Sequence, residues 1–447
     1  FNLKVPCEAW WYFLTPGTLT FPLVPRVGGV RTRSTVALYM GYIMSLMRAL
    51  VAPRIGLREI GPALAFLLSL APFDVLPFFA SRGEHYVYQM ICLCFGGQQW
   101  RFGCQMVQVA LWTGAGLSKV GPWFKYVVGF MVPNCVFLRD HIPQVRKMIM
   151  KDPPHDTRPS SLGIILAHAG TATEIVMGIL CAWERTRKAG LFAMTGFHFF
   201  IISQTPIASV FEWNIYSILM GWYLFGYGEG VKVAKISYRL IAFLVCALVV
   251  VPVYGQLCPE KVPFLMAYRP YAGNWRWMWC LITKSALPRL HRLRTFDDTP
   301  LPGRKAIPLF GSEPQYEEHI DYVSTASLML FPSYRALPGI VDNLNDRYGR
   351  KIDDVHVIPH VPFENYVVGW SLGIGWGMFR DSFRASMQSV CAFDAGECIF
   401  IQFEPLGLTR RDVHWRAVDV STGEVLMSGH NQYSELEQLQ DPLGLMI

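Results

Sequence analysis

The sequence predicts a polytopic α-helical membrane protein of about eight spans, followed by a small C-terminal α+β domain. Three observations support this fold class. The 447-residue chain is 52% hydrophobic and 16% charged, with a mean hydropathy of +0.27, whereas about 25% of the residues in a soluble chain are charged. The apolar residues are gathered in runs before about Leu257. After that position the composition is that of an ordinary soluble domain, so we expect the membrane part to end there.

Four regions are expected along the chain. Residues 1–33 are rich in aromatic residues, Pro and Gly, and we expect an interfacial segment in which rings such as that of Trp10 lie among the lipid headgroups. Residues 34–257 are predicted as the helical membrane domain, 258–310 as a juxtamembrane linker and 311–447 as a soluble α+β domain.

The spans are predicted from apolar runs whose length approaches the roughly 20 residues that a helix needs to cross the hydrocarbon. The runs are about 34–53, 61–80, 86–96, 102–118, 161–182, 189–208, 211–226 and 238–257. The third of these is short. Between the fourth and the fifth, the stretch GPWFKYVVGFMVPNCVFL is interrupted by Lys125 and Pro133. It predicts a re-entrant or interfacial helix anchored by Trp123 and Tyr126.

The region after Leu257 mixes helical and strand patterns. YAGNWRWMWCL is a second aromatic signal of the membrane interface. Helical spacing covers about 313–330 and 377–391, and strand alternation covers 354–359, 365–371, 397–404 and 412–420. The residues STGE at 421–424 predict a hairpin turn into a last strand.

Ionisable side chains inside the apolar runs are the candidate functional residues. Each costs about 2.5–3.5 kcal/mol at a helix centre, so such groups usually face an interior or a cavity. The candidate catalytic residues are Lys119, His168, Glu174 and His198. Lys119 ends a span and would serve as a base if an apolar site lowered its pKa. The alternative is that Lys119 extends its ammonium group to the lipid headgroups. The position of Lys119 at the end of a span favours this alternative.

Helical geometry restricts how these residues act together. His168 and Glu174 are six residues apart, which turns about 240° around a helix, so they do not share a face. Thr171 lies between them and would link them in a spiral hydrogen-bond path. The alternative is a polar network between helices that includes His198 and Asn214. Any site here must therefore be assembled across helices.

The remaining polar residues favour structural roles. Glu212, a further member of the predicted network, follows Pro206 near a helix start, where the helix dipole stabilises a carboxylate. Several of the 11 cysteines lie in apolar runs, where Cys behaves as a small hydrophobe, and none has zinc or redox spacing. We predict no metal, structural disulfide or cofactor, and a bound lipid or quinone is the ligand compatible with the site.

The charge distribution indicates contact with lipid headgroups. The net charge is +7, in short loop clusters such as Arg31 with Arg33. No basic face with interleaved aromatic residues indicates nucleic acid. We expect membrane lipids and other membrane-protein subunits as partners. The start at Phe1 without methionine suits processing after import into an organellar inner membrane, or an incomplete chain.

Nine motifs in order resemble a known family. They are FLTPGTLTFP, SRGEHY, GAGLSKVGPWF, DTRPSSL, LAHAGTATE, FEWNIY, YRPYAGNW, GWSLGIG and AVDVSTGE. The chain resembles, over nearly its whole length, an uncharacterised transmembrane family that is best represented in actinobacteria and is named as a domain of unknown function. Relative to that family, an N-terminal portion with further apolar segments is expected to be missing.

Residues 102–226 are also distantly similar to the horizontally transferred transmembrane domain of vitamin K-dependent γ-carboxylases. The shared outline is a span that ends in Lys119 before Trp123, a span that begins near His168, and His198 on the next span. The resemblance implies that Lys119 is a base acting on a quinol. The lumenal part of the carboxylase is not recognisable, so carboxylation is not inferred.

Two functions of different classes agree with the sequence. The favoured one is a structural or accessory subunit of a larger membrane complex, because the chain lacks a complete catalytic constellation. The alternative is a membrane enzyme that acts on a lipid or quinone-like substrate, with Lys119 as base. A transporter is less favoured because no inverted repeat is present. A cavity that reached Lys119 and both histidines would favour the enzyme.

Overall fold

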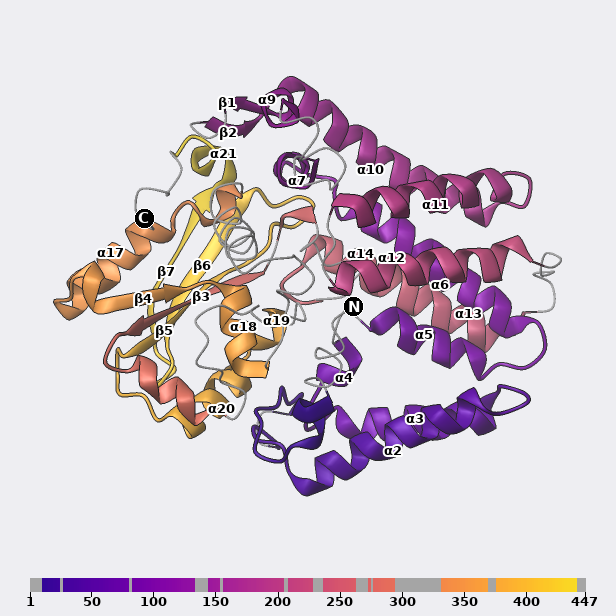
Figure 1. Cartoon of the computed structure of the whole chain (residues 1–447), viewed down its shortest axis with the longest axis horizontal. Helices are drawn as coiled ribbons and strands as arrows, with labels where there is room; N and C mark the ends of the chain where they lie inside the picture. The colour runs from indigo at the N-terminus through magenta and orange to yellow at the C-terminus, as the bar shows by residue number, and fades with distance from the viewer. Residues whose placement is uncertain are drawn as a thin grey trace.

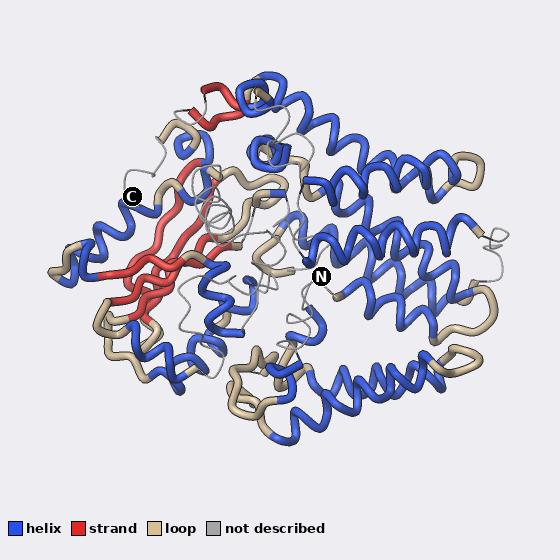
Figure 2. Tube along the Cα trace, viewed as in Figure 1, coloured by secondary structure: helices blue, strands red, loops and turns tan. Residues whose placement is uncertain are grey.

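A computed structural model of the chain describes residues 10–24, 27–79, 83–132, 144–152, 156–204, 208–227, 236–262, 272–274, 276–293, 331–368 and 375–439. It has two parts. Long helices lie side by side in one part, and the other holds a five-stranded antiparallel sheet with shorter helices around it (Figure 1). Figure 2 shows the strands of this sheet gathered on the opposite side of the molecule from the long helices.

The helical part follows the apolar runs of the sequence. Its helices are α2 (Arg33–Leu50), α3 (Leu57–Leu70), α4 (Leu76–Phe79), α5 (Glu84–Leu93), α6 (Gln99–Leu117), α10 (Ser161–Ala182), α11 (Arg187–Gln204), α12 (Ala208–Gly221) with η2 (Trp222–Gly226), and α13 (Tyr238–Val245) with η4 (Cys246–Val250) and α14 (Val251–Leu257). Serine side chains cap two of them: Ser160 accepts from the Gly163 amide at the start of α10, and Ser237 from the Leu240 amide at the start of α13.

The prediction of eight membrane spans is wrong. Within the part of the chain that the structure describes, two helices are long and apolar enough to cross a membrane, Ser161–Ala182 and Tyr238–Leu257, with mean hydropathies of 1.7 and 2.4. Helices α3 and α5 have 14 and 10 residues and rise about 21 and 15 Å, against about 30 Å of hydrocarbon. Helix α6 is long enough but carries an arginine and three glutamines.

Glycines bring α6 and α10 close together. A Cβ atom on Gly116 would lie 2.6 Å from Cγ1 of Ile175, and one on Gly178 would lie 2.6 Å from Oγ1 of Thr113. No side chain fits at either position without displacing the neighbouring helix. Small residues of this kind are typical of helix contacts in membranes.

The sheet has the strand order β4-β3-β5-β6-β7. The strands are β3 (Trp277–Thr283), β4 (Val355–Ile358), β5 (Cys398–Phe403), β6 (Asp412–Asp419) and β7 (Val425–Gln432). Strand β3 lies within 258–310, the stretch predicted as a linker, and pairs with both β4 and β5. All seven of its residues are buried, so Trp277 and Trp279 of the stretch predicted at the membrane interface lie inside the protein.

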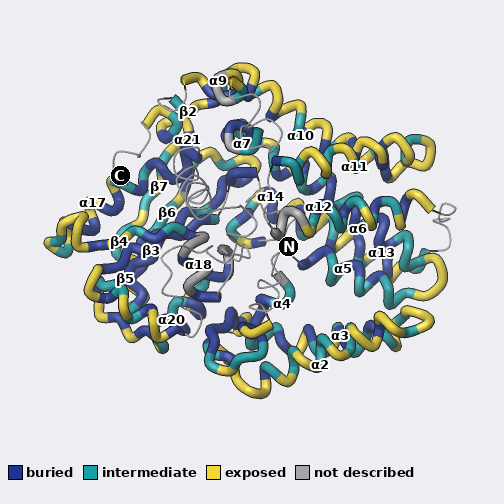
Figure 3. The backbone as a smooth tube through the Cα atoms, viewed as in Figure 1, coloured by how far each residue is buried: buried dark blue, intermediate teal, exposed yellow. Residues whose placement is uncertain are grey.

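The two faces of β3 pack against different parts of the chain, because side chains alternate along a strand. Trp277, Trp279 and Leu281 belong to a core that also holds residues of α7 (Phe124–Met131) and α17 (Leu337–Tyr348). Met278, Cys280 and Ile282 pack in a second core with Tyr12 and Phe21 of the N-terminal segment and with α18 (His360–Val368) and α20 (Asp381–Cys391). The central strands β3 and β5 are buried along their whole length, whereas Figure 3 shows many exposed residues on the long helices.

Several local predictions are corrected. Trp123 and Tyr126, predicted as interfacial anchors, are 0% and 2% exposed within the core between α7 and the sheet. A strand was predicted at 365–371, but residues 365–368 belong to helix α18, which ends at Val368. The hairpin prediction is confirmed by the pairing of β6 with β7. The helix predicted at 313–330 lies outside the described residues.

The remaining elements are short. They are α9 (Val145–Ile149), β1 (Met150–Asp152), β2 (Asp156–Pro159), η6 (Leu287–Arg292), η8 (Pro332–Tyr334), η9 (Ile352–Asp354), α19 (Gly375–Met378) and α21 (Tyr433–Leu436). Strands β1 and β2 form a hairpin just before α10. Helix α21 follows β7 and lies near α7 (Figure 1).

A buried ion pair fixes the N-terminal segment. Arg31, predicted to contact headgroups, instead donates from Nη2 to Oδ2 of Asp74 at 2.7 Å, and both side chains are 0% exposed. Its Nε donates to Oγ1 of Thr18 at 3.0 Å. Asp74 also accepts from the backbone N–H of Phe21 and Leu76. These bonds join the start of the chain to the α3–α4 connection.

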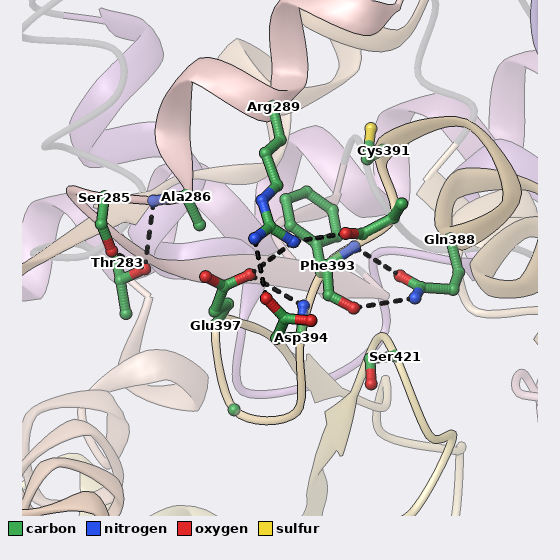
Figure 4. A network of polar contacts seen from close by, with 12 residues as sticks. Thr283, Ser285, Ala286, Arg289, Gln388, Cys391, Phe393, Asp394, Glu397 and Ser421 are labelled. Carbon is green, nitrogen blue, oxygen red and sulfur yellow. Dashed lines mark hydrogen bonds and ion pairs between the residues drawn. The ribbon is translucent and has the colours of Figure 1, made fainter.

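Arg289 of η6 holds the loop that follows α20. Its guanidinium forms ion pairs with Asp394 at 2.8 Å and Glu397 at 2.9 Å (Figure 4). It also donates to the carbonyl oxygen of Ala392. Ala392 has a φ of +53°, which residues other than glycine seldom adopt. The arginine therefore stabilises the turn from α20 towards β5.

Candidate functional site

Lys119 and Glu174 join α6 to α10. Lys119 lies two residues after Leu117, the last residue of α6, and its Nζ forms an ion pair with Oε2 of Glu174. The ammonium also donates to the carbonyl oxygen of Ala115 at 3.4 Å and lies 5.6 Å from the ring centre of Phe124. The ammonium group is thus held among a carboxylate, a carbonyl oxygen and an aromatic ring.

His198 and Asn214 form a second pair, between α11 and α12. Both are buried, at 8% and 3% exposure, and Nδ1 of His198 contacts Oδ1 of Asn214. A carboxamide oxygen only accepts hydrogen bonds, so Nδ1 carries the proton and Nε2 has the lone pair. No hydrogen bond to Nε2 is present among the described residues. Asn214 thus fixes the tautomer and the ring orientation of His198.

Glu212 forms a third contact, between α12 and α5. It accepts a hydrogen bond from the hydroxyl group of Tyr86. The two helices are also linked by Tyr216, which donates to Oε1 of Gln89. The predicted polar network therefore corresponds to separate pairs, each of which joins two different helices.

The spiral path predicted along α10 is not formed. Thr171 donates from Oγ1 to the carbonyl oxygen of Ala167 at 3.0 Å, within its own helix. Its hydroxyl group makes no hydrogen bond in the structure to His168 or Glu174, both of which are described. His168 is exposed on α10, whereas Glu174 is buried against Lys119.

A cavity of about 690 Å³ lies where α10 meets the sheet-containing part. Its walls come from α10, from the loop between α6 and α7, and from α21 with the residue before β6. His168 and Thr171 line it, but Lys119 and His198 do not. This cavity therefore does not bring the candidate catalytic residues together.

Sequence reasoning missed the charged residues of this cavity. Lys125, noted there only as an interruption of an apolar stretch, pairs with Glu437 at 2.8 Å, and Tyr126 donates to the same carboxylate oxygen at 2.9 Å. Arg411 also lines the cavity. These residues are far apart in the chain, and no spacing in the sequence places them together.

The described residues contain no group of three or more His, Cys, Asp or Glu side chains that would hold a metal ion. The side chains of Lys119 and Glu174 are instead paired with each other, that of His198 is paired with Asn214 and that of Glu212 with Tyr86. These paired side chains connect neighbouring helices to one another. The cavity beside α10 has room for a small ligand.

Comparison with known proteins gives one match. The sequence model of a family described as "Transmembrane protein of unknown function (DUF3556)" matches residues 1–441. No curated protein matches the chain, and no solved structure matches it. The similarity to γ-carboxylases over 102–226 is not shown by these comparisons.

Proposed function

The chain belongs to the DUF3556 family of transmembrane proteins, and on that premise we propose that it is a non-catalytic, accessory subunit of a larger membrane assembly, in contact with lipid. It is a membrane protein, as its family is. The organellar inner membrane predicted from the first residue stays a prediction.

The observation that carries the proposal is the pairing of Lys119 with Glu174. The residue expected to act as a base is held in an ion pair, with side-chain exposures of 12% and 7% for the lysine and the glutamate. His198 is likewise held by Asn214. Polar side chains that meet across helices in this way stabilise helix association in membranes.

Exposed apolar side chains on short helices support the same proposal. Met44 and Met47 of α2 are 65% and 58% exposed, and Leu68 of α3 is 64% exposed. Helix α3 is too short to cross the hydrocarbon alone. Its apolar face would be covered by lipid and by neighbouring subunits, since contiguous apolar surfaces mark interaction sites.

The test is purification of the full chain from its native membrane in a mild detergent or directly in nanodiscs. We expect a particle that contains further membrane proteins, and we expect Leu68→Glu to release them. Val425→Glu is the matched control, because Val425 is exposed on the edge strand β7 of the sheet. A lone monomer, with identical behaviour of both variants, would refute the accessory role.

One observation favours the second candidate, an enzyme that acts on a lipid or quinone-like substrate with Lys119 as base. The cavity lies against α10, the helix that carries Glu174. For this candidate, substrate binding would have to separate Lys119 from Glu174. Turnover of lipid or quinol that is lost in Lys119→Met, and kept in the matched variant Lys188→Met on the exposed start of α11, would support the enzyme.

A further inference from the structure

One stripe of α10 faces the cavity. Ile164, His168, Thr171 and Ile175 all line it, and their spacing of i, i+4, i+7 and i+11 places them on a single helix face. The stripe is apolar at both ends, with the imidazole and the hydroxyl group between. Ile165, the neighbour of Ile164 on α10, is 63% exposed, so the cavity adjoins a surface of the helix that suits hydrocarbon.

The lining residues outside α10 carry the charges. Lys125 and Glu437 neutralise each other through their ion pair at 2.8 Å. Arg411 is exposed beside the cavity, and its guanidinium group forms no ion pair with the residues that the structure describes. With the Lys125–Glu437 pair balanced, the lining of the cavity has one further positive charge, that of Arg411, and also includes His168.

We propose that this cavity is a binding site for an anionic phospholipid. The phosphate group lies between the guanidinium of Arg411 and the imidazole of His168, and an acyl chain runs along Ile164 and Ile175. Guanidinium groups bind phosphate through paired, charge-assisted hydrogen bonds. Basic pockets beside membrane helices bind anionic headgroups in this way.

The size and position of the cavity suit this ligand. Its volume of about 690 Å³ lies within the range of about 300–1,000 Å³ typical of small-molecule sites. It opens at the boundary between a helix long enough to cross a membrane, α10, and the sheet-containing part. A phosphate there would lie at headgroup level and a chain along α10 at the level of the hydrocarbon.

The test uses the full chain in phosphatidylcholine nanodiscs that contain a minor share of phosphatidylglycerol with a photoactivatable acyl chain. We expect cross-links to α10 and α21 that unlabelled phosphatidylglycerol suppresses and that phosphatidylcholine does not. Inorganic phosphate serves as the second competitor. Suppression by inorganic phosphate alone at millimolar concentration would show a phosphate site rather than a lipid site, and would overturn the proposal.

Two pairs of variants separate charge from shape. Arg411→Gln should lower lipid occupancy about tenfold, which corresponds to one charged hydrogen bond, while Arg239→Gln, at an exposed arginine at the start of α13, should leave it unchanged. Ala172→Trp fills the cavity that Ala172 lines and should abolish the cross-link. Ala169→Trp, on the same helix and exposed outside the cavity, should not.

Thermal unfolding of each variant checks that it is folded. Equal labelling by photoactivatable phosphatidylcholine and phosphatidylglycerol, or equal effects of Ala172→Trp and Ala169→Trp in folded protein, would overturn the proposal. The measurement is made on the chain itself, so it does not depend on whether further subunits are present. Its failure is therefore distinguishable from failure of the accessory role.

Discussion

The ammonium group of Lys119 and the carboxylate of Glu174 form an ion pair between α6 and α10. Their helices touch at the same level through Gly116, whose position leaves no room for a side chain beside Ile175. Close backbone approach and a charge pair therefore coincide at one contact.

Removing one member of the ion pair should destabilise the protein more than removing both. Glu174→Gln or Lys119→Met leaves a charge in a largely buried place, at a cost of about 3–5 kcal/mol. The double variant removes both charges and should recover most of that loss. Thermal unfolding in detergent measures the effect, with Glu184→Gln at an exposed site as control. Additive losses in the double variant would contradict a coupled pair.

The same substitution should have opposite effects at two helical glycines. Gly178→Ala places a methyl group 2.6 Å from Oγ1 of Thr113, whereas no atom lies within 4 Å of a Cβ built at Gly196. Alanine is the better helix former by about 1 kcal/mol. We expect Gly178→Ala to lower the unfolding temperature and Gly196→Ala to raise it slightly. Two shifts of the same sign would argue against tight α6–α10 packing.

His360 should make stability depend on pH. Burial lowers its pKa from 6.5 to about 3, and its Nδ1 accepts a hydrogen bond from the backbone N–H of Met278 at 3.3 Å. Below about pH 6.5 the unfolded state takes up a proton that the folded state refuses, so stability falls as the pH falls. The contribution is at most about 1.4 kcal/mol per pH unit.

His360→Asn removes this titration and keeps an acceptor for Met278. Unfolding of the wild-type chain and of the variant is compared at about pH 7.5 and about pH 5. The wild-type chain should lose more stability between the two than the variant does. A constant difference between the two proteins at both pH values would show that His360 does not titrate in this range.

Cysteines in the core of the sheet should resist alkylation. Burial raises the pKa of Cys391 to about 12 and raises that of Cys398, and only the thiolate reacts readily. We expect iodoacetamide at about pH 8 to spare both until the chain unfolds, while Cys258, partly exposed after α14, is modified first. Mass spectrometry of pulse-labelled protein distinguishes these positions. Early labelling of Cys398 would contradict a closed core.

The sequence predicted the two most apolar helices well. The run at 161–182 coincides with α10 and that at 238–257 with the succession from α13 to α14. The run at 161–182 is apolar apart from a few polar residues such as His168 and Glu174, and the only charged residue of the run at 238–257 is Arg239, near its start. Hydropathy and length therefore agree there. At α3 and α5 an apolar composition was read as a span, although an apolar helix also forms where its residues pack against protein.

The aromatic residues were the main source of error. Tryptophan has an apolar ring and one polar N–H group, so the same residue suits a membrane interface or a protein core. Trp279 and Trp123 are both fully buried, and β3 was therefore missed. The candidate site was predicted in part. The sequence pointed to Lys119, Glu174, His198 and Asn214, but it did not show which of these residues form pairs. Those pairs and the charged residues that line the cavity depend on tertiary packing.

Strand β3 has a consequence for how the chain can be divided. It hydrogen-bonds to β4 on one side and to β5 on the other, so a fragment that begins at residue 311 would lose it from the middle of its sheet. Two strand edges would be bared at once, and bare edges recruit other strands. Such a fragment would aggregate. The sheet-containing part of this protein is therefore not separable by truncation at that position.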